Sequence, residues 1–117
     1  MDSMSASEIL HVFTAYLSLK CGSDTFLKQV LYNVQLKADE LKLKELSLLL
    51  HNCTKHLLNR FDDMDITGRF IIGRMIPKLN QCDKKTVANV LPLLPVYCIG
   101  DPNIYELFSV ETVKYID

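Results

Sequence analysis

Apolar residues recur at intervals of three and four along most of the chain, and this spacing constrains the fold more than any other feature of the sequence. Ile9, Leu10, Phe13 and Leu17 form the first such stripe, and the intervals place them on one face of a helix. Further stripes occupy residues 26–34, 46–57, 70–79, 87–94 and 104–113. Alternation of apolar and polar residues, the pattern of a half-buried strand, is almost absent. The sequence therefore predicts an all-α chain of six helices.

Polar residues mark where several of these helices begin. Ser5 and Glu8 have the S-x-x-E spacing of a capping box. Ser23 or Asp24 is expected to cap the second helix and Asp83 the fifth, because short polar side chains at this position accept a hydrogen bond from a free backbone N–H. Residues 100–102, Gly-Asp-Pro, combine a helix stop, an N-cap and a proline at the first helical position. These signals predict short turns between the helices.

The chain matches itself when it is shifted by about forty residues. The segment SEILHVFTAYL (7–17) aligns with SLLLHNCTKHL (47–57), and LLLHNCTKHL (48–57) aligns with NVLPLLPVYC (89–98). The predicted core positions then coincide in the triplets Ile9/Leu49/Val90, Leu10/Leu50/Leu91 and Phe13/Cys53/Leu94. A repeat of this length is typical of helical hairpins that stack on one another.

The repeat predicts one domain over residues 1–117. Its hairpins would occupy approximately 3–42, 44–82 and 83–117 and would form a right-handed α-solenoid. A closed six-helix bundle is the alternative, because short turns between amphipathic helices are compatible with both architectures.

Residues 51–56, HNCTKH, contain the densest group of potential metal ligands and nucleophiles. On a helix His51 and Cys53 lie about 200° apart around the axis, so the two side chains cannot share a metal ion. Cys53 and His56 share a face, but the repeat places Cys53 in the core and His56 at its edge. Neither pair has a third ligand or catalytic partner of the right type nearby. We therefore predict a packed helix here, with neither a metal site nor a catalytic cysteine.

Pro92 and Pro95 interrupt the fifth apolar stripe. Their P-x-x-P spacing is also that of an SH3 ligand, but the apolar neighbours favour a kinked and buried helix. The surrounding run, residues 90–100, is about half as long as a membrane span and is broken by these prolines. We therefore predict no transmembrane helix and no membrane partner.

Charge and motifs exclude several classes of function. The formal net charge is −1, from 13 Lys+Arg and 14 Asp+Glu, so the overall charge does not favour nucleic acid. No Gly-rich phosphate loop, G-x-S-x-G or H-E-x-x-H motif is present. We predict that the protein is not an enzyme and has neither a cofactor nor a small-molecule substrate.

The cysteines and the first residues bear on the compartment. The four cysteines form no C-x-x-C pair, which argues against a zinc ribbon and a disulfide scaffold and predicts reduced thiols in an intracellular compartment. The first residues include the acidic Asp2 and Glu8, and no basic region precedes the first apolar residues. No secretory signal or organellar presequence is therefore visible.

The predicted hairpins resemble a known class of helical repeats. Two of them open with the pattern S-x-I/L-L-x-x-F/C-T, and EILHVFTAYLSLKCGSDTFLKQVLYNV (8–34) is similar in rhythm to the octotricopeptide and heptatricopeptide repeats, including those of FASTK-like and RAP-domain proteins. HEAT, armadillo and tetratricopeptide repeats share much of this rhythm. The resemblance implies a subunit of an organellar ribonucleoprotein, such as the mitochondrial ribosome. No base-reading residue can be carried over, because no fixed motif matches.

Two classes of function follow. In the first, a basic face contacts RNA, and Arg74 and Lys78 are its closest pair. Its candidate residues are Lys55, Arg60, Arg69, Arg74, Lys78, Lys84 and Lys85. In the second, the chain is a protein–protein adaptor without RNA contact, which uses the apolar face of the third hairpin. The candidate residues of that interface are Val90, Leu91, Leu94, Val96 and Ile99. A mitochondrial ribonucleoprotein subunit that contacts both RNA and neighbouring protein subunits would combine the two.

Overall fold

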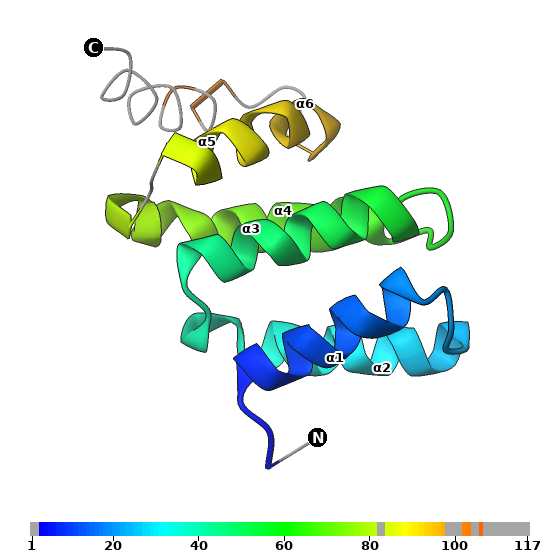
Figure 1. Cartoon of the computed structure of the whole chain (residues 1–117). Helices are drawn as coiled ribbons and strands as arrows, with labels where there is room; N and C mark the ends of the chain where they lie inside the picture. The colour runs from blue at the N-terminus through cyan, green and yellow to red at the C-terminus, as the bar shows by residue number, and fades with distance from the viewer. Residues whose placement is uncertain (1–2, 82–83, 98–101, 104–105, 107–117) are drawn as a thin grey trace.

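The structure of this 117-residue chain is a computed structural model that describes residues 3–81, 84–97, 102–103 and 106. Every regular element within these residues is helical, which confirms the all-α prediction. The helices lie in three tiers, with α1 and α2 in the first, α3 and α4 in the second, and α5 and α6 in the third (Figure 1). The tiers follow the order of the chain.

The first tier consists of α1 (Ala6–Ser18) and α2 (Asp24–Leu36), which pack against each other. Both predicted caps are confirmed. The Ser5 Oγ accepts a hydrogen bond from the Glu8 N–H at 3.2 Å, while the Ser5 N–H donates to Glu8 Oε1 at 3.0 Å. The Ser23 Oγ accepts from the Phe26 N–H at 3.1 Å. These bonds satisfy N–H groups that have no partner inside the helix, so each helix begins at a defined residue.

The second tier consists of α3 (Leu43–Asn52) and α4 (Met64–Met75). A short 3-10 helix, η1 (Ala38–Glu40), connects it to α2. Helix α3 continues into a π-helical turn, η2 (Cys53–Leu57), and α4 continues into a 3-10 segment, η3 (Ile76–Gln81). The apolar stripes predicted at 46–57 and 70–79 therefore each span two kinds of helix.

The third tier is divided near the two prolines. It contains α5 (Lys84–Val90), a 3-10 turn η4 (Leu91–Leu93) and the short α6 (Leu94–Tyr97). The change to 3-10 geometry occurs at Pro92, which lacks the N–H that an α-helix requires. This break in the helix agrees with the predicted kink. Asp83 and the predicted helix at 104–113 lie outside the described residues.

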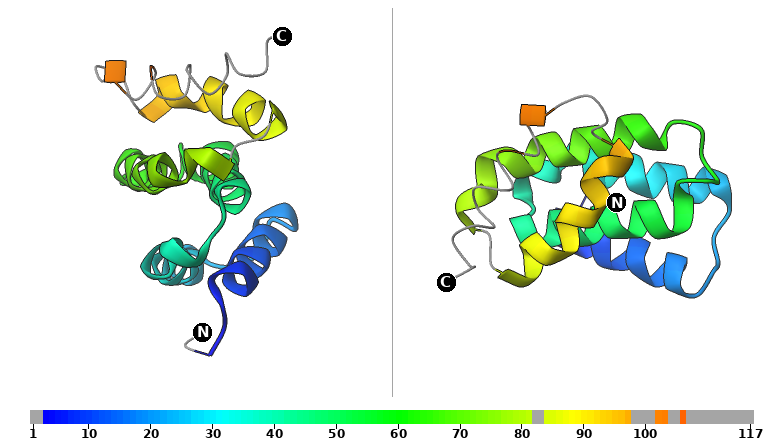
Figure 2. Two further views of the ribbon diagram at one scale, coloured as in Figure 1. Left: turned by 90° about the vertical axis from the view of Figure 1, so that its left-hand side faces the viewer. Right: turned by 90° about the horizontal axis from the view of Figure 1, so that it is seen from above.

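One apolar core runs through the three tiers. Helix α3 contacts both α1 and α5, and α4 contacts α6 (Figure 2). The described members of the repeat triplets are buried, except that Leu91 is half-buried. At the same offset the second helices of the first two hairpins match in the pairs Val30/Ile71, Leu31/Ile72 and Val34/Met75, and these residues are also buried. The forty-residue offset therefore corresponds to equivalent positions in successive tiers.

A threonine at equivalent positions of α1 and η2 joins each tier to the next. The Thr14 hydroxyl donates to the Leu10 carbonyl at 2.8 Å and accepts from Asn52 Nδ2 at 2.8 Å. The Thr54 hydroxyl donates to the Leu50 carbonyl at 2.8 Å and lies 2.7 Å from the Tyr97 hydroxyl. Since the Thr54 proton is used by the carbonyl, Tyr97 is the donor of the second bond. This explains the threonine of the repeated motif.

The burial of Tyr97 corrects one expectation of the repeat. The alignment places Tyr97 with Tyr16 and His56 at the edge of the core, yet its side chain is only 1% exposed whereas Tyr16 is 37% exposed. The reason lies in α4, where Gly68 has no Cβ. A Cβ at Gly68 would lie 2.2 Å from the Tyr97 ring, so the ring packs directly on the α4 backbone. Burial also raises the pKa of Tyr97 above its ordinary value.

We expect Gly68→Ala to destabilise the fold by about 1–3 kcal/mol, because the added methyl group overlaps the Tyr97 ring and forces the third tier to shift. The matched control is Gly73→Ala in the same helix, where a Cβ meets nothing within 4 Å. This control should stabilise the protein by about 0.4–1 kcal/mol through reduced chain entropy in the unfolded state. Urea unfolding measures both variants, and equal effects would contradict the packing of Tyr97 on Gly68.

Candidate functional site

Two of the residues predicted to contact RNA hold neighbouring segments of the chain together. Arg60, in the turn before α4, forms an ion pair with Asp24 at the start of α2. Arg69 in α4 donates from Nε to the Tyr97 carbonyl oxygen at 2.7 Å. The second contact ties α4 to Tyr97, the last residue of α6. Both arginines therefore have acceptors within the protein.

Arg74 and Lys78, the predicted phosphate-binding pair, meet at η1. The Arg74 Nη1 atom lies 3.2 Å from Asp39 Oδ1, and its guanidinium lies 5.0 Å from the centre of the Phe70 ring. The Lys78 Nζ donates to the Asp39 carbonyl at 2.9 Å and also to the Leu41 carbonyl. These contacts tie α4 and η3 to the connection between the first two tiers. The structure thus brings the pair together around acceptors of its own chain.

The remaining basic residues of that set lie apart from these contacts. Lys55 in η2 and Lys85 in α5 are exposed, and neither forms an ion pair or a hydrogen bond within the described part of the chain. The side chain of Lys84 lies outside the described residues. The seven candidates therefore do not form one continuous free face among the residues that the structure describes.

The described members of the predicted apolar protein interface differ in burial. Val90 and Leu94 are buried against the second tier, with 1% and 0% exposure. Leu91 is half-buried and Val96 is 39% exposed. Ile99 lies outside the described residues. Val90 and Leu94 thus pack the third tier onto the second, which leaves Leu91 and Val96 as the members that a partner is able to reach.

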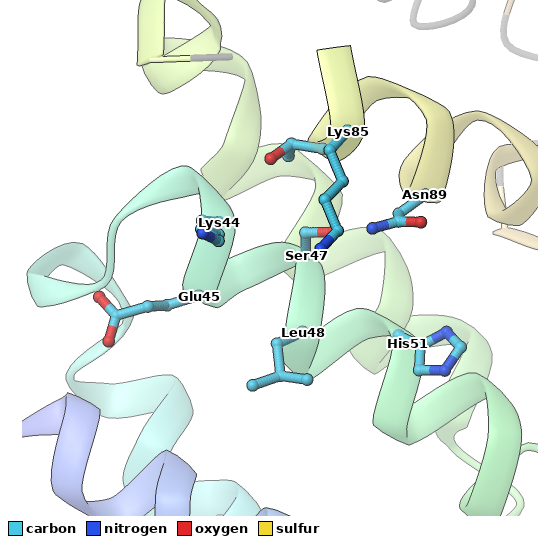
Figure 3. Close-up of a pocket in the computed structure, with 8 residues that line it drawn as sticks. Lys44, Glu45, Ser47, Leu48, His51, Lys85 and Asn89 are labelled. Atoms are coloured by element: carbon cyan, nitrogen blue, oxygen red, sulfur yellow. The ribbon is translucent and has the colours of Figure 1, made fainter. Parts of the chain in front are cut away.

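A groove between α3 and α5 is the candidate functional site (Figure 3). It has a volume of about 400 Å³ and lies at the junction of the second and third tiers. Its lining comprises Lys44, Glu45, Ser47, Leu48 and His51 from α3, and Lys85, Thr86 and Asn89 from α5. Lys85 and Asn89 extend from α5 toward α3, above Ser47 and His51.

The charged side chains of the groove are predominantly basic. Lys44, His51 and Lys85 are exposed, and Leu48 contributes an apolar side chain that is 37% exposed. The one acidic lining residue, Glu45, points away from Lys85 (Figure 3). The groove therefore offers cationic and hydrogen-bonding groups around an apolar patch.

Glu45 already has a hydrogen-bond donor at the start of its own helix. Its Oε1 accepts from the Lys42 N–H at 3.0 Å. Burial on its own raises the pKa of this carboxyl, but hydrogen bonds from the Ser7 hydroxyl and the Lys42 N–H, with the nearby positive charges of Lys42 and His11, bring the pKa below its ordinary value. The Glu45 carboxylate is thus ionised and directed at α1, so it does not neutralise Lys85.

In the segment HNCTKH, Cys53 and His56 lie where the repeat places them, in the core and at its edge. Cys53 is fully buried, and burial raises the pKa of its thiol to about 12, so the sulfur is protonated and inert at neutral pH. His56 is half-buried, and burial together with the charges of Lys55, His51 and Lys20 lowers its pKa. Among the described residues no group of three or more His, Cys, Asp or Glu side chains is arranged to hold a metal ion.

A second hollow, of about 280 Å³, lies between α2 and the start of α4. Lys28 lies over the Phe61 ring at 5.0 Å from its centre, and Tyr32 is 62% exposed. Asp62 and Asp63 also line this hollow. Because this hollow carries charges of both signs, it does not favour a ligand of one particular charge. The α3–α5 groove, whose charged side chains are predominantly basic, does favour one.

The sequence indicated only part of the groove. Lys85 belongs to the predicted basic set, and the repeat aligned His11 with His51. Lys44, Leu48 and Asn89 were missed, because their meeting depends on how α5 packs on α3.

No helix in the described part of the chain is long and apolar enough to cross a membrane.

Comparison with known proteins adds no family. No protein-family model matches the chain, and no curated protein or solved structure gives a significant match. The resemblance to the octotricopeptide and heptatricopeptide class therefore stays a prediction.

We expect iodoacetamide to modify Cys21 in the folded protein and to leave Cys53 unmodified. Cys21 is exposed, whereas Cys53 is buried with a pKa of about 12, and alkylation requires an accessible thiolate. Peptide mass spectrometry after brief treatment at pH 8 measures both sites, and treatment in urea should label both. Equal labelling in the native protein would show that the Cys53 environment is open.

We expect Glu45→Gln to destabilise the protein at pH 7 and to lose this effect at pH 3. Because the folded pKa of Glu45 is below 4.5, its charge stabilises the fold above that pH, and the contribution disappears as the pH falls through the folded pKa. Urea unfolding at the two pH values provides the measurement. Ser7→Ala, which removes one donor to Glu45, should reproduce part of the loss at pH 7. A difference that persists unchanged at pH 3 would rule out the charge as its source.

Proposed function

We propose that this chain is a non-enzymatic adaptor that binds another protein within a larger assembly. Its three tiers would form a short right-handed α-solenoid, in which α1, α3 and α5 stack in succession. The equivalent burial of the repeated positions and the two threonine links support stacked hairpins over a closed bundle. Stacked hairpins generate extended surfaces between successive helices, and such surfaces are typically used to bind partners.

The observation that carries the adaptor proposal is the placement of the basic residues. Arg60, Arg69, Arg74 and Lys78 bind acceptors of their own chain. A phosphate backbone would have to compete with these contacts, and RNA affinity without a sequence motif depends on the number of cations that are free to neutralise phosphates. The net charge of −1 points the same way.

An RNA-contacting subunit of an organellar ribonucleoprotein is the second candidate. The exposed Lys55 and Lys85 favour it, because they form no ion pair within the described residues. In this case the chain would contact RNA at one edge and neighbouring proteins elsewhere. A mitochondrial location is part of this candidate and rests on the resemblance alone.

Crosslinking of the tagged full-length chain in its own cells distinguishes the two candidates. We expect mass spectrometry to recover a specific set of proteins and parallel sequencing to recover no RNA above the level of an untagged control. RNase treatment before capture should leave the complex intact, because an adaptor contacts its partner directly. Loss of the partners after RNase, or recovery of ribosomal RNA, would support the ribonucleoprotein instead.

A further inference from the structure

We propose that the groove between α3 and α5 binds an acidic segment of the partner protein. A carboxylate of this segment would lie beside Ser47, His51 and Lys85, and an apolar side chain would pack on Leu48. The inference rests on the adaptor function proposed above and specifies the chemistry of the partner.

The tier below provides an internal example of this interaction. Ser7 and His11 lie four residues apart in α1 and therefore on one face of the helix. The Glu45 carboxylate, from the next tier, lies close enough to these two side chains for Ser7 and His11 to lower its pKa. A serine and a histidine at this spacing thus already face a carboxylate of the next tier in this protein.

The same serine and histidine recur in α3 without that carboxylate. Ser47 and His51 repeat the spacing of Ser7 and His11 forty residues later. The core matches Leu46/Val87 and Leu49/Val90 place Thr86 at the position of Glu45. Thr86 is buried and has an interaction of its own, and it carries no charge.

The lysines of the groove increase the attraction for an external carboxylate. Lys44 and Lys85 both line it, and neither forms an ion pair or a hydrogen bond with any residue that the structure describes. Glu45 is turned toward the first tier. Two lysines and a histidine that face no carboxylate other than Glu45 among the described lining residues are complementary to an acidic ligand.

The form of the groove favours a protein segment over a nucleic acid strand. A volume of about 400 Å³ accommodates a few side chains, and Leu48 provides an apolar contact. A single strand of RNA is usually bound by a longer basic track with aromatic side chains on which bases stack. Among the described residues, the lining includes no Phe, Tyr or Trp, and Asn89 is able to hydrogen-bond the backbone of a peptide.

A fluorescent peptide of glutamate, aspartate and two leucines tests this proposal directly. The comparison peptide replaces the acidic residues by glutamine and asparagine and keeps the leucines. Binding to the folded, full-length protein is measured by fluorescence anisotropy at low and high salt. We expect the acidic peptide to bind more tightly, with an affinity that falls as the salt concentration rises, because the contacts are partly exposed ion pairs.

Lys44→Gln combined with Lys85→Gln should weaken the acidic peptide about ten-fold, as expected when two partly exposed ion pairs are lost. The matched control, Lys20→Gln with Lys55→Gln, removes the same charge from exposed positions outside the groove and should change the affinity less than two-fold. Circular dichroism checks that both variants fold. Equal weakening by the two pairs, or equal binding of the two peptides, would overturn the proposal.

Photo-crosslinking in cells separates failure of this inference from failure of the adaptor function. A crosslinking amino acid replaces Asn89 in the groove or, as a comparison, Ile66, which is 65% exposed on α4. Capture of an acidic segment from position 89 supports the groove as the docking site. Capture of a protein only from position 66 overturns the groove while the adaptor function stands. Capture of RNA from position 89 overturns both.

Discussion

Helix α3 holds the three tiers together, because it packs on α1 from one side and on α5 from the other. Most of its residues are buried, including Leu43, Leu46, Leu49 and Leu50. A single amphipathic hairpin exposes an apolar face that it cannot cover itself, and stacking covers it with the next hairpin. Since apolar burial is the main driving force of folding, each tier is stabilised chiefly by its neighbours.

Apolar packing alone does not fix how far one tier slides or rotates against the next. The bonds Thr14–Asn52 and Thr54–Tyr97 are directional and cross the two tier boundaries, so they select one register. The basic side chains act in the same way: Arg74 and Lys78 bind η1 and thereby orient α4 against the first tier. Residues that suggest RNA binding in the sequence therefore serve the architecture.

The extent to which the sequence predicts this structure depends on how local each feature is. The caps at Ser5 and Ser23 and the buried stripes depend on neighbours within one helix, and all were predictable from spacing. The burial of Tyr97 was not, because it depends on the absence of a side chain at Gly68 in another helix. For the same reason the groove and the hydrogen-bond acceptors of the arginines could not be predicted. A sequence shows the sign of a charge but does not show which residue the charged group contacts.

The two tier boundaries differ at their surfaces while their interiors remain equivalent. The core keeps apolar residues at matching positions such as Leu49 and Val90, because a change there would leave a cavity or a clash. At the rim, Glu45 lies at the lower boundary and its pKa is lowered by Ser7 and His11, whereas Thr86 at the corresponding place supplies no carboxylate to the upper boundary. Repetition thus provides the same geometry twice, and we propose that divergence at this one position, from a carboxylate to a buried threonine, makes the upper boundary available to another molecule.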